Sequence, residues 1–368
     1  MRLKFAICLP SITKPAALGG GFLNTIRFAE LLRQHADVEL VGYRRKEDGV
    51  WFLPDVESQL ITERFVLVTV WGPDVRYLVE RYHSRLPVLY YQNGIDYGVR
   101  LYPDVPVLCA SRYLLGHAQE QWPGNPQFYL PPVLGPDCAN LHQSRDIDVT
   151  IVRRKMPSYV VETLVQMLEP HCRVHLLEDF VERSALYRLF NRTRVYVYAF
   201  APQRADHSST GWRMMEGFGI QPLEASVCGC TIFTNLRGGL ADYVDPWVHG
   251  YRLESHSPAW DVHQILQAVK NYSDGPESTH QRHLIEHYSE EAFHTRAKAL
   301  IAFLEDYLPF AATHPPDTQA FGFPEPITRW ERMRDRTAST LSRWKRSLVG
   351  PRPQRDGDEV DRRRPASV

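Results

Sequence analysis

The chain has 368 residues, of which 43% are hydrophobic and 23% charged, a composition typical of a globular protein with more than one domain. Lys plus Arg and Asp plus Glu both total 43, so the formal net charge is zero and no charge excess indicates a nucleic-acid partner. The six cysteines include no Cys-x-x-Cys pair, which argues against a structural zinc site and is typical of a reducing compartment. Because no apolar stretch reaches about 18 residues, we expect no membrane-spanning helix.

The first part of the chain alternates strand-like and helix-like segments. Continuous apolar runs predict buried strands, and apolar residues at helical spacing predict the helices between them. The predicted strands are residues 3–9, 38–43, 65–70, 88–91 and 105–110, and the predicted helices are residues 22–32, 75–82 and 111–121. This order predicts a parallel sheet with right-handed crossovers. A stretch rich in Pro, Gly and Asn follows, and it ends a predicted first domain, residues 1–145.

The same alternation restarts in a predicted second domain, residues 146–308. Its predicted strands are residues 148–152, 173–177, 195–200 and 231–234, and its predicted helices are residues 157–168, 184–190, 220–228, 259–272 and 290–307. The sequence therefore predicts an α/β protein with two Rossmann-like domains. Residues 309–348 are predicted to be a Pro-rich crossover followed by a basic helix, and residues 349–368 a disordered tail.

Two loops of the first domain are candidates for a ligand-binding cleft. Gly20 and Gly21 precede a predicted helix, where a glycine-rich backbone can approach a phosphate, although a plain turn is the alternative. Asn93 and Asp96 follow a predicted strand, and the ends of strands in open α/β sheets line ligand crevices. Contact with an acceptor substrate is one interpretation of this pair, and an Asn-Gly turn is the other.

The segment with the clearest chemistry joins Glu216 to a predicted helix that contains Glu224. Gly217 and Gly219 allow a close backbone approach to a ligand, and Pro222 suits a first helical turn. Free N–H groups at such a helix N-terminus bind anions, so we expect a diphosphate there. Carboxylates repel phosphates but accept hydrogen bonds from sugar hydroxyls. We therefore expect Glu224 to hold a ribose and Glu216 to hold the sugar beyond the diphosphate.

This segment resembles the donor motif of glycosyltransferase family 4, with seven residues between Glu216 and Glu224 and Gly-Phe-Gly after the first. The similarity extends over residues 195–253 and includes a Gly-Gly turn. The resemblance implies a GT-B fold, with two Rossmann-like domains facing each other across a cleft. It also implies a retaining enzyme that uses a nucleoside diphosphate sugar and needs no metal, with Glu216 as catalytic residue. The implied donor contacts are Arg154, Lys155, Gly217, Phe218, Gly219, Ile220, Glu224, Gly238 and Gly239, and the cleft residues are Gly20, Gly21, Asn93 and Asp96.

The predicted clamp on the diphosphate departs from the pattern of this family. The family has Gly-Arg after the first strand of its second domain and a Lys a few residues later, whereas this chain reads Arg153-Arg154-Lys155. Arg154 matches the Arg position, and Lys155 is a candidate for the role of the missing Lys. A long polar loop before Glu216 carries Arg204 and Arg213, which are further candidates for that cation.

The resemblance leads us to expect a cytoplasmic hexosyl- or deoxyhexosyltransferase that acts on a glycan or glycolipid in surface polysaccharide biosynthesis. One alternative is a nucleotide-sugar epimerase or phosphorylase of the same architecture. Another is a non-catalytic partner protein with this fold, which the altered clamp keeps open. The basic residues of 327–348 suit contact with an anionic membrane at its inner face, or a helix that packs back on the first domain.

Overall fold

The computed structural model describes residues 2–12, 20–70, 72, 74–95, 99–153, 156–179, 181–200, 203–204, 213–214, 216–248, 250–254, 257–275 and 277–315. All of these residues belong to one compact unit, Met1–Glu325. The predicted basic helix and tail lie outside the described residues, as do Asp96, Arg154 and Lys155.

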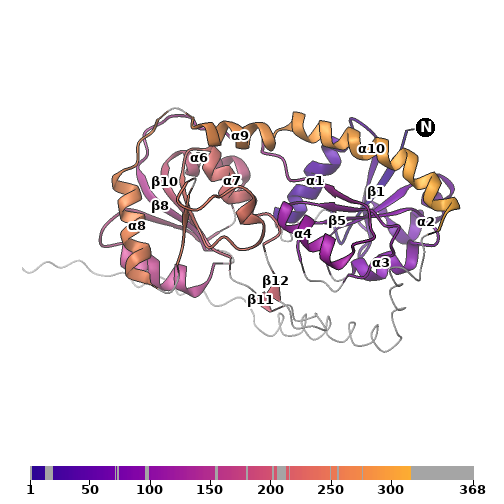
Figure 1. Cartoon of the computed structure of the whole chain (residues 1–368), viewed down its shortest axis with the longest axis horizontal. Coiled ribbons are helices and arrows are strands. Elements are labelled where there is room, and N and C mark those ends of the chain that lie inside the picture. The colour runs from indigo at the N-terminus through magenta and orange to yellow at the C-terminus, as the bar shows by residue number, and fades with distance from the viewer. Residues whose placement is uncertain are drawn as a thin grey trace, which may run out of the picture. The chain divides into compact units, whose positions relative to one another are not determined.

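A parallel sheet of seven described strands forms the centre of the first domain (Figure 1). Its order is β3 (Trp51–Phe52), β2 (Asp37–Gly42), β1 (Lys4–Leu9), β4 (Val66–Val70), β5 (Val88–Gln92), β6 (Val107–Cys109) and β7 (Gln127–Tyr129). In the parallel register, Phe5 lies beside Val38 on one side and Val66 on the other. Every residue of β4 and β5 is buried, which explains why these strands read as continuous apolar runs.

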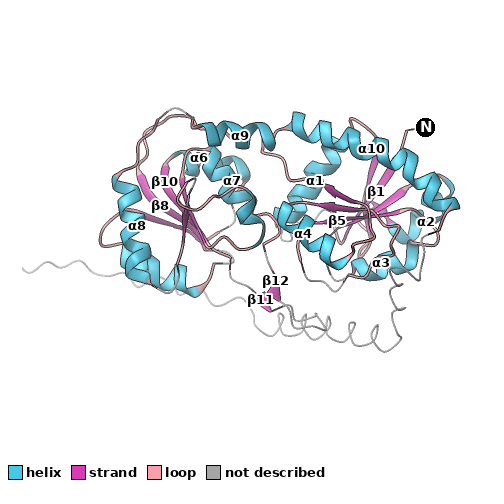
Figure 2. Ribbon diagram, viewed as in Figure 1, coloured by secondary structure: helices cyan, strands magenta, loops and turns pink. Residues whose placement is uncertain are grey.

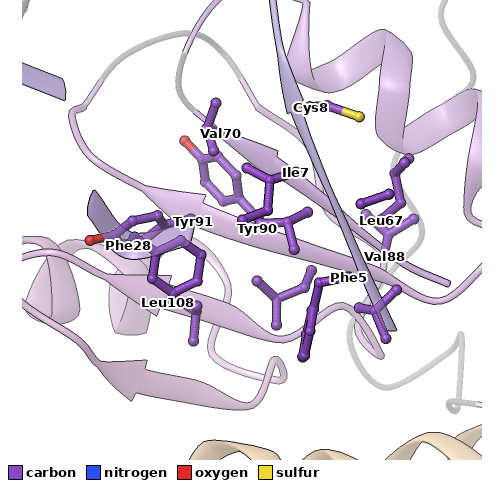
Figure 3. Close-up of a cluster of buried hydrophobic side chains, with 14 of the residues drawn as sticks. Phe5, Ile7, Cys8, Phe28, Leu67, Val70, Val88, Tyr90, Tyr91 and Leu108 are labelled. Atoms are coloured by element: carbon purple, nitrogen blue, oxygen red, sulfur yellow. The ribbon is translucent and has the colours of Figure 1, made fainter. Parts of the chain in front are cut away.

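Within residues 1–145, the helices that contribute to the core of this sheet are α1 (Gly20–Leu32), α2 (Leu53–Thr62), α3 (Val75–Tyr82) and α4 (Arg112–Gln121). Figure 3 shows Phe28 of α1 beside Tyr91 and Leu108, and the Phe28 and Tyr91 ring centroids are 4.9 Å apart. Each such side chain contributes about 2 kcal/mol by leaving water. The core therefore fixes the ends of β1 and β5, where the candidate cleft loops begin.

Helix α10 (Glu290–Thr313) packs onto the first domain, whereas its residues up to 308 are predicted to belong to the second (Figure 1). Phe293, Ala297 and Leu300 are buried in the core of the first sheet. The spacing of apolar residues predicts that one face of this helix is buried, but it does not predict against which of the two sheets that face packs. The helix also continues through Pro309, where the predicted crossover begins, although a proline at this position removes one helical hydrogen bond and crowds the preceding turn.

The second domain has a parallel sheet of five described strands, seen in magenta in Figure 2. Its order is β14 (Tyr251–Arg252), β13 (Thr231–Thr234), β10 (Thr193–Tyr198), β8 (Ile147–Val152) and β9 (Val174–Leu177). Its helices are η2 (Tyr159–Leu164), α5 (Val165–Leu168), α6 (Arg183–Asn191), α7 (Ile220–Val227), η3 (Gly238–Asp242), α8 (Pro258–Lys270) and α9 (Thr279–His287). The polar loop before Glu216 contains a short antiparallel pair, β11 (Gln203–Arg204) and β12 (Arg213–Met214).

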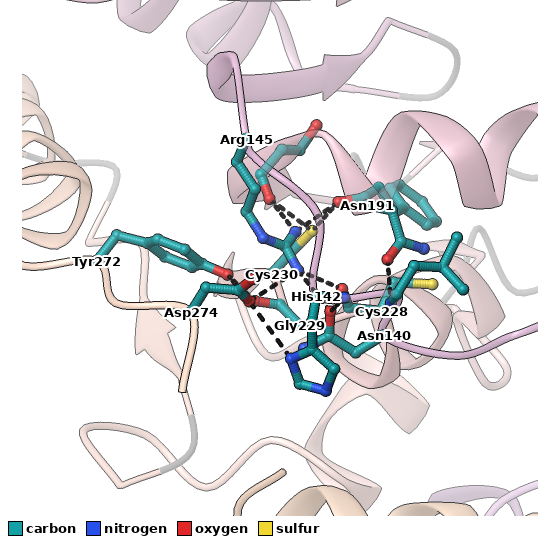
Figure 4. Close-up of polar contacts among 12 residues, drawn as sticks. Asn140, His142, Arg145, Asn191, Cys228, Gly229, Cys230, Tyr272 and Asp274 are labelled. Carbon is teal, nitrogen blue, oxygen red and sulfur yellow. Dashed lines mark hydrogen bonds and ion pairs between the residues drawn. The ribbon is translucent and has the colours of Figure 1, made fainter. Parts of the chain in front are cut away.

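Arg145, in the segment between the two sheets, ties together the C-terminal ends of α6 and α7 (Figure 4). Its Nη1 donates to the carbonyl of Phe190 at 2.8 Å, and its Nη2 donates to the carbonyl of Cys228 at 2.7 Å. Both carbonyls lie at helix C-termini, where a cation offsets the negative end of the helix dipole. The two helices that carry Arg183 and Glu224 are thus held at their far ends by one buried side chain.

Candidate functional site

A cavity of about 190 Å³ opens where loops from both sheets meet. Of the predicted site residues, those on its wall are Gly20, Gly21, Asn93, Glu216, Phe218, Gly219, Ile220 and Glu224. The sequence did not identify its other lining residues, which are Leu23, Asn24, Pro132, Val152, Leu177, Asp179, Val181, Arg183, Leu186, Tyr198 and Gln221. The structure therefore brings together candidates from residues 20–24, 93 and 216–224, which lie far apart in the sequence.

The N-terminus of α7 faces this cavity. Gly219 occupies the N-cap position with a φ of 77°, in the left-handed region that favours glycine. A Cβ there would lie 2.4 Å from a Leu240 side-chain carbon, so both the backbone conformation and the packing require glycine. Glycine offers no side chain to cap the first turn, whose N–H groups have no partner within the helix. The free N–H groups make this end of α7 suitable for an anion.

Three predicted donor contacts, Gly217, Gly238 and Gly239, do not line the cavity but lie where backbone segments cross. A Cβ on Gly217 would lie 2.0 Å from the backbone oxygen of Asn93, and one on Gly238 would lie 2.0 Å from that of Glu216. The Gly239 N–H also donates to the Glu216 carbonyl at 2.9 Å. These glycines position the loop that carries Glu216, and their predicted contact with a donor stays a prediction.

The Glu216 carboxylate is half-buried on the cavity wall, just before α7. Its Oε2 accepts a hydrogen bond from the Tyr198 hydroxyl at 2.7 Å. Burial, with a contribution from Glu216, raises the pKa of Tyr198 well above its ordinary value, so this hydroxyl remains a proton donor. The contact fixes the carboxylate at the end of β10 and leaves it acceptor capacity toward the cavity.

Glu224 lies one turn inside α7 and is 1% exposed. Its Oε1 accepts hydrogen bonds from Arg183 Nε at 2.6 Å and from the Tyr187 hydroxyl at 2.8 Å. Burial raises the pKa of Glu224, while the Arg183 charge and the Tyr187 hydrogen bond work in the opposite direction. The sequence predicted the helix that carries both partners but no role for either of them.

A hydrogen-bonded contact between the two domains lies beside the Gly238-Gly239 turn. The Asp242 carboxylate accepts hydrogen bonds from the backbone N–H groups of Arg112 at 2.5 Å and Tyr113 at 3.2 Å, at the N-terminus of α4. A carboxylate at this end of a helix is favoured by the helix dipole. Asp242 thus links the turn that supports Glu216 to the first domain.

The described residues contain no group of three or more His, Cys, Asp or Glu side chains arranged to hold a metal ion. None of the helices in the described ranges combines the length and apolar character needed to cross a bilayer. The diphosphate clamp predicted at Arg154 and Lys155 and the acceptor contact predicted at Asp96 fall on residues outside the described ranges.

The family model described as "Glycosyl transferases group 1" matches residues 157–288. The matched region runs from the start of η2 to the end of α9 and contains Arg183, Glu216 and Glu224. It also contains residues 195–253, on which the sequence resemblance rests. No curated protein matches this chain by sequence.

Solved structures of glycosyltransferases with the GT-B fold resemble the chain and confirm the predicted fold. Sucrose-phosphate synthase from Thermosynechococcus elongatus is 14% identical, with a TM-score of 0.60 over 84% of this chain and 100% of that one. A glycosyltransferase from Rickettsia africae ESF-5 is 10% identical, with a TM-score of 0.58 over 83% of this chain and 99% of that one. Anabaena HepE, solved with UDP and glucose, is 13% identical, with a TM-score of 0.51 over 82% and 99% of the two chains. The chain spans only 57% of the length of TarM, another similar structure.

Proposed function

We propose that this protein is a retaining glycosyltransferase that moves a hexosyl or deoxyhexosyl group from a nucleoside diphosphate sugar to a hydroxyl of a glycan or glycolipid. One observation carries the proposal: the N-terminus of α7 faces a cavity whose wall also contains two carboxylates, Glu216 and Glu224. The match of this region to Glycosyl transferases group 1 supports the same assignment.

In the proposed complex the donor diphosphate lies at the N-terminus of α7, where backbone N–H groups stabilise its negative charge. Glu224 accepts hydrogen bonds from the ribose, and Glu216 accepts them from the transferred sugar, because neither carboxylate is suited to a phosphate. Arg154 and Lys155 follow β8 in the sequence and would add positive charge beside the diphosphate. HepE, with UDP and glucose bound, is a structural precedent for such a donor in this fold.

Transfer begins when the bond between the anomeric carbon and the diphosphate oxygen breaks, so negative charge develops on the departing diphosphate. The amides of α7 are already aligned toward that charge, which lowers the barrier without reorganisation. The acceptor hydroxyl attacks from the face that the diphosphate leaves and gives its proton to the departing diphosphate oxygen. This course retains the anomeric configuration without an enzyme nucleophile. The role of the enzyme in this scheme is to position both substrates and to exclude water from the reacting carbon.

The proposed setting is surface polysaccharide synthesis in the cytoplasm, with the basic residues of 327–348 directed to the inner face of the membrane. These residues carry several arginines interleaved with Trp330, Met333 and Trp344, a composition that suits an anionic interface. Binding of the full chain to vesicles with and without anionic lipid tests this part separately from catalysis.

The proposal is tested by incubating the protein with UDP-, GDP-, ADP-, dTDP- and CMP-sugars, with and without simple sugar acceptors, and following the products by NMR. We expect one donor to be consumed with release of its nucleoside diphosphate and formation of a glycoside of unchanged anomeric configuration, also in the presence of EDTA. An inverted product would contradict the retaining mechanism. Conversion of the donor alone to an isomeric nucleotide sugar would indicate an epimerase, and binding without turnover a non-catalytic partner.

A further inference from the structure

A buried tyrosine hydroxyl contacts the N-cap residue of α7. The Tyr243 hydroxyl donates a hydrogen bond to the carbonyl of Gly219, with which this helix begins. The direction of the bond is fixed, because a carbonyl can only accept. Burial raises the pKa of Tyr243 well above its ordinary value, so the hydroxyl keeps the proton that it donates.

The Tyr243 side chain has little freedom to move. It is 4% exposed, and its ring packs against Phe218 and Tyr288, with ring centroids 5.5 Å and 6.4 Å away. A Cβ added to Gly219 would lie 3.2 Å from the Tyr243 hydroxyl oxygen, so the hydroxyl lies directly against this backbone. The Gly219 carbonyl is therefore held on the side of the core of the second domain, to which Tyr243 belongs.

The position of this carbonyl determines the direction of the next N–H group. The Gly219 C=O and the Ile220 N–H belong to one peptide unit, and none of the described peptide bonds is cis. In a trans unit the two groups point in opposite directions. Because the oxygen is held toward the core, the Ile220 N–H is directed toward the cavity, whose wall contains both residues. A carbonyl that accepts a hydrogen bond also makes the N–H of its own unit a stronger donor.

Helix α7 has few N–H groups to offer a ligand at this end. Pro222 has no N–H, so Ile220 and Gln221 supply the free N–H groups of the first helical turn. Both residues are partly exposed on the cavity wall, where a ligand can reach them. The left-handed Gly219 permits rotation of the adjoining peptide units more readily than another residue would. A hydrogen bond from a rigid side chain limits this rotation at the point where an anion would bind.

We propose that Tyr243 is a positioning residue for the donor diphosphate. Its hydroxyl keeps the peptide unit between Gly219 and Ile220 in the orientation in which the Ile220 N–H donates to a phosphate oxygen. Tyr243 is not part of the wall of this cavity, so it acts through the backbone alone. The inference rests on the proposed glycosyltransferase function, which the family match over residues 157–288 supports independently of the helix geometry.

The test observes the Ile220 N–H directly by NMR. If glycine is labelled at its carbonyl carbon and isoleucine at its nitrogen, magnetisation transfer across the peptide bond selects the isoleucines that follow a glycine. The sequence has two of these, Ile95 and Ile220, and an Ile95→Val variant assigns the signals. We expect the Ile220 amide proton to shift downfield when the wild type is saturated with the nucleotide that it binds among UDP, GDP, ADP and dTDP. The reason is that a hydrogen bond to a phosphate oxygen deshields this proton.

Tyr243→Phe removes the hydroxyl and keeps the ring. Its affinity for the same nucleotide should be roughly fivefold lower, as expected for one neutral hydrogen bond, and the Ile220 shift at saturation should be smaller. Tyr272→Phe is the matched control, because the Tyr272 hydroxyl donates to the Gly229 carbonyl at 3.0 Å, just beyond the other end of α7. It should keep the wild-type affinity and the wild-type shift. Thermal unfolding profiles show that both variants are folded.

Different results contradict different parts of the account. The inference is wrong, while the proposed function stands, if the wild type binds a nucleotide without a shift of the Ile220 signal. The same holds if folded Tyr243→Phe keeps its affinity, or if Tyr272→Phe loses as much affinity as Tyr243→Phe. The wild-type measurement needs no change at Tyr243, so it decides the question even if Tyr243→Phe does not fold. If the wild type binds none of the four nucleotides, the proposed function fails and takes this inference with it.

Discussion

Arg183 Nε lies 2.6 Å from Glu224 Oε1, so a carboxylate that is 1% exposed obtains its counter-ion from the neighbouring helix. Tyr187, one turn further along α6, donates to the same oxygen at 2.8 Å. Both hydrogen bonds within the described ranges thus fall on Oε1, and Oε2 remains for a ligand in the cavity. A buried carboxylate left without such partners would favour its protonated form, which accepts hydrogen bonds less well.

Arg183→Met should make donor binding weaken toward acid pH more than it does in the wild type. Burial already raises the pKa of Glu224, and removal of the opposing Arg183 charge raises this pKa further. Because the ionised carboxylate is the form that accepts ribose hydroxyls, donor affinity should fall as the pH falls through the raised pKa. The fall is about tenfold for each pH unit below that pKa. Calorimetric titration of the donor between about pH 5 and about pH 8 measures it.

Two further variants separate charge from shape in this experiment. Arg183→Lys keeps a cation beside Glu224 and should retain most of the wild-type pH profile. Arg188→Met removes an exposed arginine from the same helix and should leave the profile unchanged. A pH-independent affinity in Arg183→Met would show that Arg183 does not control the ionisation of Glu224.

Glu216→Gln should lower kcat by about 10-fold to about 100-fold, since hydrogen bonds to a charged group contribute about 1.5–3 kcal/mol. The affinity for the nucleoside diphosphate product should stay the same, because Glu216 is proposed to contact only the transferred sugar. Steady-state kinetics and product inhibition measure the two effects. The control is Glu169→Gln, at an exposed position just after α5. Weaker product binding in Glu216→Gln would place this residue on the nucleotide instead.

Gly238→Ala should destabilise the fold far more than Gly49→Ala, although both glycines have a positive φ. The φ values are 67° and 71°, so an alanine costs about 1–2 kcal/mol at either position. Only at Gly238 would the new Cβ also meet a backbone oxygen, that of Glu216, whereas the space around Gly49 is open. Urea unfolding should therefore show a loss of more than about 3 kcal/mol for Gly238→Ala. Equal losses would mean that the close crossing at Glu216 is not maintained.

Arg145→Met should lower the free energy of unfolding by about 3 kcal/mol, because several buried carbonyls lose their charged donor at once. Arg145 is 6% exposed and donates to the carbonyls of Phe190, Thr193 and Cys228. Arg192→Met is the control, since its ion pair with Asp146 is exposed and should contribute less than about 1 kcal/mol. Similar losses in the two variants would contradict the role of Arg145 in joining α6 to α7.

Sequence reasoning identified the segment around α7 because its glycines and proline constrain the backbone locally. The predicted helix begins just after Gly219, and the structure gives this glycine the left-handed conformation that favours glycine. The donor contact predicted for Gly238 stays a prediction, and the structure shows in addition that this glycine allows a close approach between two backbone segments far apart in sequence. The sequence pattern indicates that a glycine is required at such a position. It does not indicate which distant backbone segment passes close to that glycine.

Other elements escaped prediction because their sequence signal is weak. Helix α9 buries only Leu284 among its nine residues, so it has almost no apolar stripe to recognise. Strand β7 has three residues and lies in the Pro-rich stretch that was interpreted as the linker between the domains. The Arg183–Glu224 pair joins residues 41 positions apart on two helices, and no periodicity within either helix predicts their contact.

The most direct test of the central claim is calorimetric binding of UDP, GDP, ADP and dTDP to the wild-type protein and to Glu224→Ala. The account predicts that one of these nucleotides binds to the wild type and that its affinity falls at least about tenfold in the variant, because a charge-assisted hydrogen bond to the ribose is lost. The account would be contradicted if none of them bound the wild type, or if the same nucleotide bound Glu224→Ala with unchanged affinity.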